Sequence, residues 1–470
     1  MILIPGARKK SFGVFGLGVS GIAACEALAA SGAKVFSWDE KPEVRKRTEG
    51  TEFLAEHPKA WPWKELDAVV VSPGVPLTFP KPHAIVRKSQ QEKVPVIGDT
   101  ELFARAVNDL PKEARPRVVA VTGSNGKSTT AALIGHVLND VGEIAYVGGN
   151  IGEAVLSLPA FRPEAIYVLE LSSFQLDLTA SLRANAAVFL NFSPDHLDRH
   201  GSLEAYLDAK KRIFLNQQSD DIAIVGVDDS YAQSTCTELT AKACANVAPV
   251  SANSTLGRGV YALEGELFHN MDGKTSRAGA LSNAQSLRGE HNHQNAAAAL
   301  AACLHLGVSP ALFIRAAERF SSLPHRMEEV ARVGKVVFIN DSKATNAAAA
   351  ARALSAYSDI FWIAGGKAKE EGASPLRALM KPVHAAYLIG EDAPLFEEQL
   401  GAAVDCVQCH DLQTAVMRAG ADAAASDAAN PVVLLSPACA SYDQFKNFEA
   451  RGAAFSGLAK TLSVENGAAA

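Results

Sequence analysis

An apolar run leads directly into a glycine-rich turn at Val118-Val119-Ala120-Val121-Thr122-Gly123-Ser124-Asn125-Gly126-Lys127-Ser128-Thr129. The pattern predicts a buried strand that ends at a phosphate-binding loop, followed by a helix from Ser128 to about Asn139. Gly123 and Gly126 let successive N–H groups face an anion, and Lys127 supplies a cation to the outer phosphates. Ser128 or Thr129 offers a hydroxyl to Mg²⁺. A nucleoside triphosphate is therefore the first ligand to expect.

The match to the phosphate-loop pattern G-x-x-x-x-G-K-[ST] is partial, because position 121 holds valine where the pattern has glycine. The alternative interpretation is an ordinary strand-turn-helix without a ligand. Gly-Lys-Ser-Thr at a strand-to-helix junction favours the phosphate loop.

Length and composition are those of a globular protein with roughly three domains. The 470 residues include 45 basic and 51 acidic side chains, a net charge of -6, and no long run of Lys and Arg marks a nucleic-acid footprint. No stretch of about 18 apolar residues suggests a membrane span. We expect neither a nucleic-acid partner nor a membrane-spanning segment.

The amino terminus superficially resembles a bacterial lipoprotein signal, because Arg8-Lys9-Lys10 precedes an apolar stretch that ends at Cys25. Glycines at loop spacing and the acidic Glu26 argue against that interpretation. Seven cysteines, an odd number, give no disulfide framework and fit a reducing compartment. We therefore predict a cytoplasmic protein.

Residues 11–39 predict a strand-helix-strand unit with the loop Gly16-Leu17-Gly18-Val19-Ser20-Gly21. Taken alone, this loop is the fingerprint of a dinucleotide site, and Asp39 lies where it could hold a ribose hydroxyl. A further strand over 68–71 ends at a turn containing Gly74. The pattern predicts a doubly wound parallel sheet.

The order of predicted elements indicates an α/β protein with three domains. Linkers are expected at 108–117 and near 321–324, and strands alternate with Ala-rich helices beyond the second linker. We predict an N-terminal Rossmann-like domain over 1–112, a central P-loop ATPase-like parallel sheet over 113–322, and a C-terminal Rossmann-like domain over 323–470.

Charged side chains follow two predicted strands of the central domain. Glu170 ends one strand, and the next delivers Asp195 and His196 to the same edge of the sheet, where α/β proteins bind ligands. A histidine among acids beside a phosphate loop suggests a metal site, whereas a loop of solvated charges is the alternative. Lys210, on a predicted helix over 203–215, would be surface charge on sequence grounds alone.

Several motifs, taken together and in this order, resemble the Mur ligases. They are residues 122–128, Gly149-Asn150-Ile151-Gly152, Glu170-Leu171-Ser172-Ser173-Phe174-Gln175, Asp195-His196-Leu197-Asp198, Leu323-Pro324-His325-Arg326 and residues 340–346. The run over 435–448 and the glycine-rich amino terminus are most similar to the members that add D-glutamate to UDP-N-acetylmuramoyl-L-alanine in peptidoglycan precursor synthesis. The resemblance implies ATP, two Mg²⁺ ions, an acyl-phosphate intermediate and a monomer.

The resemblance also implies the residues that carry this chemistry. The catalytic set is Lys127, Asn150, Glu170, His196 and Lys210. The two Mg²⁺ ions are expected on Ser128, Glu170, His196 and Lys210, the last as a carbamate, because an ammonium cannot bind a cation. ATP contacts are expected from Gly123, Ser124, Asn125, Gly126, Lys127, Ser128, Thr129, Asn292, Asn295, Arg326 and Asp341. The UDP substrate is expected on Gly18, Val19, Ser20, Asp39, Glu40, Lys41, Gly74, Asn150, Ser172, Ser173 and Gln175. D-glutamate is expected on Lys343, Thr345, Lys369, Ser441, Tyr442 and Phe448.

One segment departs from the family pattern. Relatives often read Gly-Gly-Asp-Gly-Lys where this chain has Gly365-Gly366-Lys367-Ala368-Lys369, so a lysine replaces an acid. Three rival functions are considered. A nicotinamide-dependent oxidoreductase leaves the phosphate loop and Glu170 unexplained, and a sister Mur ligase or folylpolyglutamate-type ligase conflicts with the segment over 436–448. A regulator that has lost catalysis conflicts with the intact catalytic set.

Overall fold

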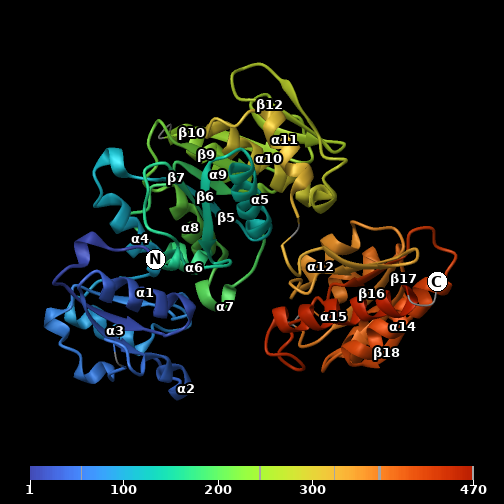
Figure 1. Cartoon of the computed structure of the whole chain (residues 1–470), viewed down its shortest axis with the longest axis horizontal. Coiled ribbons are helices and arrows are strands. Elements are labelled where there is room, and N and C mark those ends of the chain that lie inside the picture. Colours follow the sequence, from blue (N-terminus) through green and yellow to red (C-terminus); the bar gives the residue numbers. More distant parts are fainter. Residues whose placement is uncertain (54, 243–244, 322, 369–371, 468–470) are drawn as a thin grey trace. The chain divides into compact units, whose positions relative to one another are not determined.

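The computed structural model describes residues 1–53, 55–242, 245–321, 323–368 and 372–467. The chain divides into two compact units, the first formed by Met1–Ala284 with Asn292–Phe320 and the second by Gln285–His291 with Ser321–Ala470. Within the described residues, the first unit holds two sheets and the second holds one (Figure 1). None of the helices in the described ranges is both long enough and apolar enough to cross a membrane.

The amino-terminal sheet is parallel throughout its described strands, in the order β2-β1-β3-β4. Its strands are β1 (Ser11–Phe15), β2 (Lys34–Trp38), β3 (Ala68–Val71) and β4 (Val96–Ile97). The helices beside it are α1 (Val19–Ala30), α2 (Pro42–Arg45), α3 (Ala84–Glu92) and α4 (Asp99–Asn108). The predicted strand-loop-helix-strand unit is confirmed, with the glycine-rich loop between β1 and α1.

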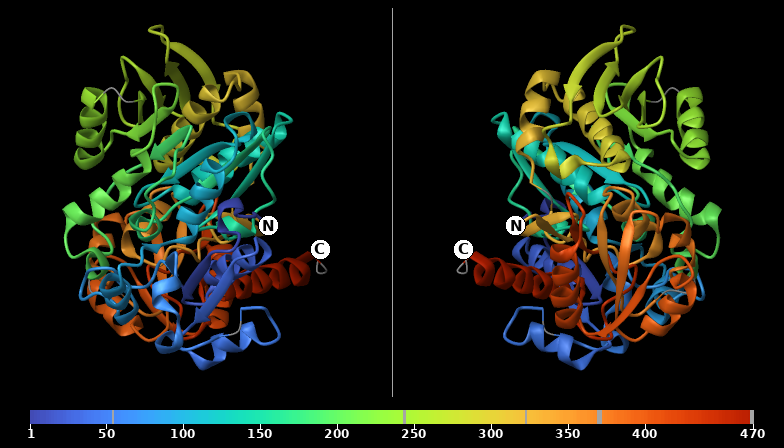
Figure 2. Two further views of the ribbon diagram at one scale, coloured as in Figure 1. Left: turned by 90° about the vertical axis from the view of Figure 1, so that its left-hand side faces the viewer. Right: turned by 90° about the vertical axis from the view of Figure 1, so that its right-hand side faces the viewer.

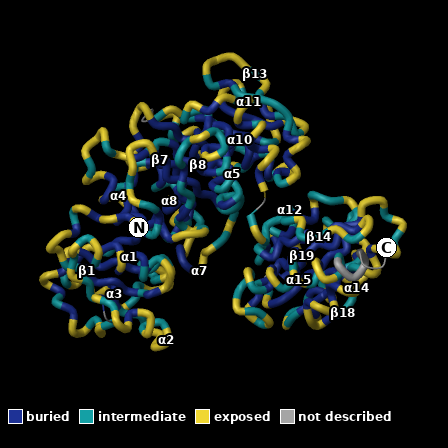
Figure 3. The backbone as a smooth tube through the Cα atoms, in the orientation of Figure 1, coloured by how far each residue is buried: buried dark blue, intermediate teal, exposed yellow. Residues whose placement is uncertain are grey.

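The central sheet has the order β13-β12-β11-β10-β9-β8-β5-β7-β6 among the described residues. Its strands are β5 (Arg117–Thr122), β6 (Ile144–Gly149), β7 (Ala165–Glu170), β8 (Ala186–Phe189), β9 (Ile222–Gly226), β10 (Asn246–Ser251), β11 (Gly259–Leu263), β12 (Glu266–Asn270) and β13 (Ser276–Ala280). Its helices are α5 (Lys127–Asp140), α6 (Ser173–Asp177), α7 (Leu197–His200), α8 (Leu203–Lys211), α9 (Ser230–Lys242), α10 (Glu290–His305) and α11 (Pro310–Arg319). The middle strands are buried on both faces, as expected for a sheet covered by helices (Figure 3).

The expectation of a purely parallel central sheet is wrong at one end. Strands β11, β12 and β13 pair antiparallel with one another and extend the sheet beyond β10 (Figure 2). Glu264 and Gly265, both at positive φ, form the two-residue turn between β11 and β12. Such a turn gives tight antiparallel hairpins, so this pair of residues was the available sequence signal.

The two sheets of the first unit share one apolar core, which includes Leu28 from α1, Phe103 from α4 and Tyr167 from β7. Glu101 on α4 adds a polar link between them. Its Oε2 accepts hydrogen bonds from the backbone N–H groups of Ala180 (2.8 Å) and Ser181 (2.9 Å). These contacts hold the amino-terminal sheet against the central one.

The second unit contains a sheet in the order β14-β15-β19-β16-β17-β18 among its described residues, with helices on both faces. Its strands are β14 (Glu328–Val333), β15 (Val336–Asn340), β16 (Ile360–Gly365), β17 (Val383–Ile389), β18 (Cys406–His410) and β19 (Val432–Leu435). Its helices are α12 (Ala347–Leu354), α13 (Ala393–Leu400), α14 (Leu412–Ala425) and α15 (Phe448–Gly467). The predicted parallel pattern holds except for β14, which forms an antiparallel hairpin with β15 across a turn at Gly334.

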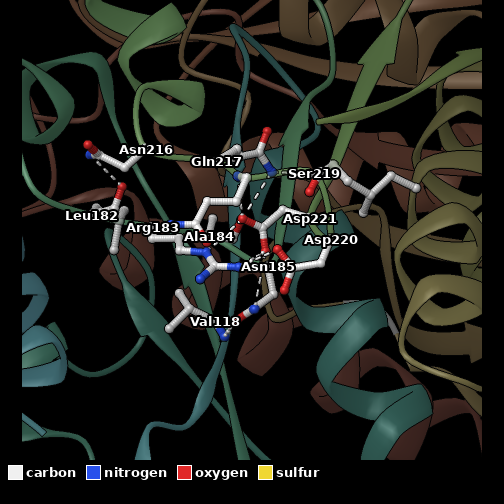
Figure 4. Close-up of polar contacts among 12 residues, drawn as sticks. Val118, Leu182, Arg183, Ala184, Asn185, Asn216, Gln217, Ser219, Asp220 and Asp221 are labelled. Carbon is white, nitrogen blue, oxygen red and sulfur yellow. Dashed lines mark hydrogen bonds and ion pairs between the residues drawn. The ribbon is translucent and has the colours of Figure 1, made fainter. Parts of the chain in front are cut away.

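A polar cluster at the amino ends of β5, β8 and β9 fixes these strands together (Figure 4). Asp221 is fully buried and accepts hydrogen bonds from Arg183 Nε (2.8 Å) and Asn185 Nδ2 (3.3 Å). Asn185 Oδ1 in turn accepts from the backbone N–H of Val118 (2.9 Å). The start of the strand that carries the glycine-rich turn is therefore set by a buried carboxylate.

We predict that Asp221→Ala lowers the free energy of unfolding by about 3 kcal/mol, because it leaves part of the Arg183 guanidinium buried without its partner. The midpoint of urea unfolding measures the change. Asp220→Ala is the matched control, since Asp220 binds the same guanidinium (2.6 Å) from an exposed position and should contribute little. Equal losses in the two variants would contradict the assignment.

Candidate active site

The glycine-rich loop between β5 and α5 has the geometry of a phosphate-binding loop. Gly123 and Gly126 take positive φ values of 151° and 82°, and Gly126 directly precedes the first residue of α5. Lys127 Nζ folds back over the loop and donates to the carbonyl oxygens of Gly123 and Ser124, both at 3.0 Å. The predicted strand, loop and helix are confirmed, and the loop places a cation at a helix amino terminus, the kind of position that accepts phosphate.

A carboxylate, a hydroxyl and an amide meet beside this loop. Glu170, at the carboxyl end of β7, is buried and accepts hydrogen bonds from Ser128 Oγ (2.5 Å) and Asn150 Nδ2 (3.0 Å). Thr129 follows Ser128 on α5 and is half-buried. The structure thus brings together three residues that the sequence motifs placed in the catalytic and metal sets.

Lys210 reaches the same loop from α8. Its Nζ donates to the carbonyl oxygen of Gly123 (2.7 Å) and lies 4.7 Å from the centroid of the Tyr206 ring. Burial, together with the charge of Lys127, holds the pKa of Lys210 well below its usual value. Lys210 is therefore not the surface charge that a helical lysine would otherwise be, and its neutral amine form is favoured.

His196 lies beside this group on the turn that leads into α7. The residue has a φ of 54°, and its ring contacts the rings of Phe174 (5.0 Å between centroids) and Tyr206 (6.0 Å). Tyr206 shares a hydrogen bond with Ser124 Oγ (3.2 Å), so it joins the histidine to the loop. Sequence reasoning gave Tyr206 no role, although its position four residues before Lys210 on one helix was the available signal.

His196 and Lys210 fit a divalent metal only if Lys210 is modified. Within the described ranges, no group of three or more His, Cys, Asp or Glu side chains is placed to hold a metal ion. The expected set contains a hydroxyl, a carboxylate and an imidazole, which are metal ligands, and an amine that lacks an anionic oxygen. A carbamate on Lys210 would supply that oxygen.

The helix α10 lies against the loop at Gly126. Asn295 Nδ2 donates to Asn292 Oδ1 (3.1 Å), while the buried Asn295 Oδ1 has no hydrogen-bond partner. A Cβ at Gly126 would lie 2.2 Å from that oxygen. The loop therefore requires glycine here and has a buried acceptor beside it, which fits a bound nucleotide.

The amino-terminal loop is shaped by its own side chains. Asp39 accepts hydrogen bonds from the N–H groups of Leu17 (2.7 Å) and Lys41 (2.9 Å), so both of its oxygens organise the loop. Gly18 and Ser20 frame the start of α1, where Val19 is 71% exposed. The other residues expected to hold the UDP substrate divide between this sheet and α6. In the first group, Glu40 pairs with His83 and Gly74 lies in the turn after β3. On α6, Ser172 and Gln175 cap the helix, and Ser173 shares a hydrogen bond with His200.

In the second unit, two loops expected to hold D-glutamate lie side by side. Lys343 Nζ is 3.8 Å from the centroid of the Phe448 ring. Arg451, which sequence reasoning missed, is fully buried and donates to the carbonyl oxygens of Ser342 (2.8 Å) and Cys439 (3.2 Å). Its guanidinium thereby joins the segment that carries Lys343 to the segment that carries the buried Ser441.

The remaining expected residues of the second unit differ in exposure. Thr345 is half-buried, Tyr442 is 75% exposed, and Lys369 lies outside the described residues. Asp341 accepts a hydrogen bond from Ser436 Oγ (2.8 Å), and burial raises the pKa of Asp341 to about 7. Lys367, where the sequence departs from the expected family pattern, pairs through its backbone with Ala440.

Comparison with known proteins gives consistent matches over the whole chain. Residues 121–303 match the family model described as Mur ligase middle domain, and residues 325–439 match the one described as Mur ligase, glutamate ligase domain. The UDP-N-acetylmuramoylalanine–D-glutamate ligase of Caulobacter vibrioides (strain NA1000 / CB15N) is 50% identical over 470 residues, which is 100% of both chains. The ligase of the same name from Rhizobium meliloti (strain 1021) is 44% identical over 462 residues, 98% of both.

Solved structures share the fold at lower identity. The UDP-N-acetylmuramate-alanine ligase from Thermotoga maritima is 17% identical with a TM-score of 0.59, covering 97% of this chain and 100% of that one. The MurF ligase from the same organism, in complex with ADP, is 14% identical with a TM-score of 0.58, covering 99% and 98%. These likenesses concern the α/β architecture.

We predict that the protein loses stability as the pH rises from near 4 to about 7, because the folded state holds a proton on Asp341 that the unfolded chain releases from near pH 3.8. Asp341→Asn should remove that loss, on the order of 1.4 kcal/mol per unit of pKa shift. Urea midpoints at pH 5 and pH 8 measure it. Asp405→Asn, at an exposed position of the same unit, is the control. Parallel pH profiles for wild type and Asp341→Asn would refute the buried, protonated carboxyl.

Proposed function

This chain belongs to the Mur ligase family, whose members are ATP-dependent amide ligases, and we propose that it joins D-glutamate to UDP-N-acetylmuramoyl-L-alanine in peptidoglycan precursor synthesis. One observation carries the proposal. Lys127 and Lys210 both donate to the carbonyl oxygen of Gly123, in the loop that leads to the Ser128–Glu170 hydrogen bond. A lysine cation, a second, buried lysine and a carboxylate at one loop fit a triphosphate with its metal ion.

The proposed reaction needs activation, because joining a carboxylate to an amine is uphill in water. The carboxylate of the UDP substrate takes the γ-phosphoryl group of ATP, and ADP is released. The neutral amine of D-glutamate attacks the resulting acyl phosphate, and the tetrahedral intermediate loses phosphate and the amine proton to give the amide. Lys127 neutralises charge on the phosphoryl oxygens, and Asn150 offers an amide donor beside them. The protein mainly positions the reactants and supplies charge.

Mg²⁺, when bound, would stabilise negative charge on the transferring phosphoryl group. Ser128 and Glu170 would hold one ion through oxygen ligands. His196 and a carbamylated Lys210 would hold the second. Carbamylation forms a bond between Nζ and the carbon of CO₂ and releases a proton, so it requires the neutral amine, and the lowered pKa of Lys210 supports that requirement.

The proposed D-glutamate pocket lies in the second unit. Lys343 is packed over Phe448, which limits the positions of the ammonium group, and Ser441 lies on the neighbouring segment that Arg451 holds. A dicarboxylate suits a pocket with cationic and hydroxyl groups. Lys369 and Thr345 are proposed as further contacts.

We also infer the remaining organisation of the enzyme. The glycine-rich loop before α1 is proposed to bind the diphosphate of the UDP substrate, since a helix amino terminus accepts phosphate. Three functional domains over 1–112, 113–322 and 323–470 are proposed, with each sheet serving one substrate. A monomer working in the cytoplasm fits a small-molecule ligase that uses ATP.

The decisive measurement is phosphate release with ATP, UDP-N-acetylmuramoyl-L-alanine and a panel of amino acids. D-glutamate should exceed D-glutamine, L-lysine and alanine by at least about tenfold in kcat/KM, because a buried cation left unpaired costs several kcal/mol. A better rate with L-lysine or meso-diaminopimelate would overturn the proposal.

Lys343→Ala should raise the KM for D-glutamate far more than the KM for ATP. Lys446→Ala, an exposed lysine in the neighbouring segment, is the control and should leave both unchanged.

A separate prediction concerns Lys210. Lys210→Ala should lower kcat by at least about a hundredfold, because loss of the carbamate removes a metal ligand that stabilises the transition state. Small carboxylic acids at high concentration should restore part of the rate. Lys211→Ala is the matched control, since Lys211 pairs with Glu238 outside the loop. Near-normal turnover by Lys210→Ala would exclude the metal-ligand role.

A further inference from the structure

The side chain of Asn191 forms two hydrogen bonds with the backbone in the middle of the glycine-rich loop. Asn191, two residues beyond the end of β8, accepts a hydrogen bond at Oδ1 from the backbone N–H of Asn125 (2.9 Å). Its Nδ2 donates to the carbonyl oxygen of Asn125 (3.3 Å). The backbone carbonyl of Asn191 also accepts from the N–H of Ser124 (2.9 Å). One amide therefore holds both polar groups of a residue in the loop.

Gln294 continues this contact to the neighbouring helix. Its Oε1 accepts from Asn191 Nδ2 (3.1 Å), and its Nε2 donates to Asp228 Oδ2 (2.8 Å). Asp228, just after β9, also accepts from Ser251 Oγ (2.5 Å) and from the N–H of Ala252 (2.9 Å). Gln294 is 7% exposed, so its two hydrogen bonds are partly shielded from water.

The direction of this hydrogen-bond chain is fixed at both ends. A backbone N–H can only donate, so Asn191 must present Oδ1 to Asn125 and Nδ2 to Gln294. Asn191 Nδ2 donates to Gln294 Oε1, so the other end of the Gln294 amide is Nε2, which donates to Asp228 Oδ2. Glutamine is a side chain that meets both demands at this length. Glutamate would set a carboxylate against Asp228, and methionine would remove one hydrogen bond from Asn191 and one from Asp228.

Gln294 also lies on the helix that faces the nucleotide side of the loop. The adjacent Asn295 places its unpartnered Oδ1 against Gly126. Gln294 bonds through Asn191 to the loop and lies next to Asn295 on α10. It therefore fixes the distance between the loop and α10. Loop and helix are thereby held in one arrangement before any ligand arrives, which lowers the cost of binding.

We propose that Gln294 is a positioning residue for the nucleotide, which holds the phosphate loop through Asn191 and anchors it through Asp228 to the ends of β9 and β10. The inference rests on the proposed function in that the loop is taken to bind ATP. Gln294 does not need to touch the nucleotide. Its effect is to fix the backbone at Ser124 and Asn125, whose N–H groups bond to Asn191, so that the turn at Gly126 and the start of α5 keep their place for the phosphates.

Calorimetric titration of the full chain with Mg²⁺-ADP tests the proposal, together with hydrogen exchange of the peptide over residues 118–129. Gln294→Met should raise the Kd for Mg²⁺-ADP about tenfold and speed exchange in the loop, because Asn191 Nδ2 and Asp228 Oδ2 each lose a hydrogen-bond partner. Gln294→Glu should weaken binding further. Gln294→Asn keeps the amide on a shorter side chain, and it replaces Gln294→Met in both measurements if Gln294→Met is too unstable to study.

Gln217→Met is the matched control. Gln217 is 8% exposed, and its Nε2 donates to the carbonyl oxygens of Ala184 (3.0 Å) and Ile222 (2.8 Å) near the amino ends of β8 and β9 (Figure 4). This variant should lose stability without changing the Kd or the exchange of the loop. A purely structural role of Gln294 would make the two methionine variants alike.

The outcomes separate this proposal from the proposed function. Unchanged loop exchange and an unchanged Kd in Gln294→Met would overturn the positioning role while leaving the ligase assignment intact. Absence of Mg²⁺-ADP binding by the wild type would instead overturn the nucleotide site, and loop exchange in Gln294→Met against Gln217→Met would still decide whether Gln294 holds the loop.

Discussion

The candidate active site depends on the parallel pairing of β6, β7, β5, β8 and β9. Parallel strands have their carboxyl ends at one edge, so each loop that follows them opens on the same side of the sheet. Glu170, the glycine-rich loop and Asn191 come from three neighbouring strands and meet there. The ion pair of Arg183 with the buried Asp221 at the opposite edge keeps these strands in register.

Burial gives the groups at this edge their chemical character. Ser128, Asn150 and Glu170 satisfy one another, so a carboxylate can remain in a site with little access to water. Lys210 is packed against a second cation and an aromatic ring, and burial therefore favours its neutral form. In the second unit, burial likewise favours the neutral form of Asp341, which is the protonated acid, and so raises its pKa.

Asparagine, glutamine and arginine side chains connect loops that the chain delivers separately. Asn191 and Gln294 do this for the phosphate loop, and Arg451 does it for the segments around Ser342 and Cys439. Each has several donors or acceptors in a planar group, so one side chain can hold two backbone segments at a fixed spacing. Such links give a binding loop a defined shape without a regular hydrogen-bond ladder.

The sequence by itself determined the features that depend on near neighbours. The strand before Gly123, the helix from Lys127 and the glycine loop before α1 follow from apolar runs and from the conformational freedom of glycine. The family motifs also identified Glu170, His196 and Lys210. The sequence did not reveal the partners, because Asn191 lies 66 residues from Asn125 and 103 from Gln294 along the chain. Only the tertiary structure brings such residues together. The packing of strands and helices sets which amides face each other, and local sequence preferences do not.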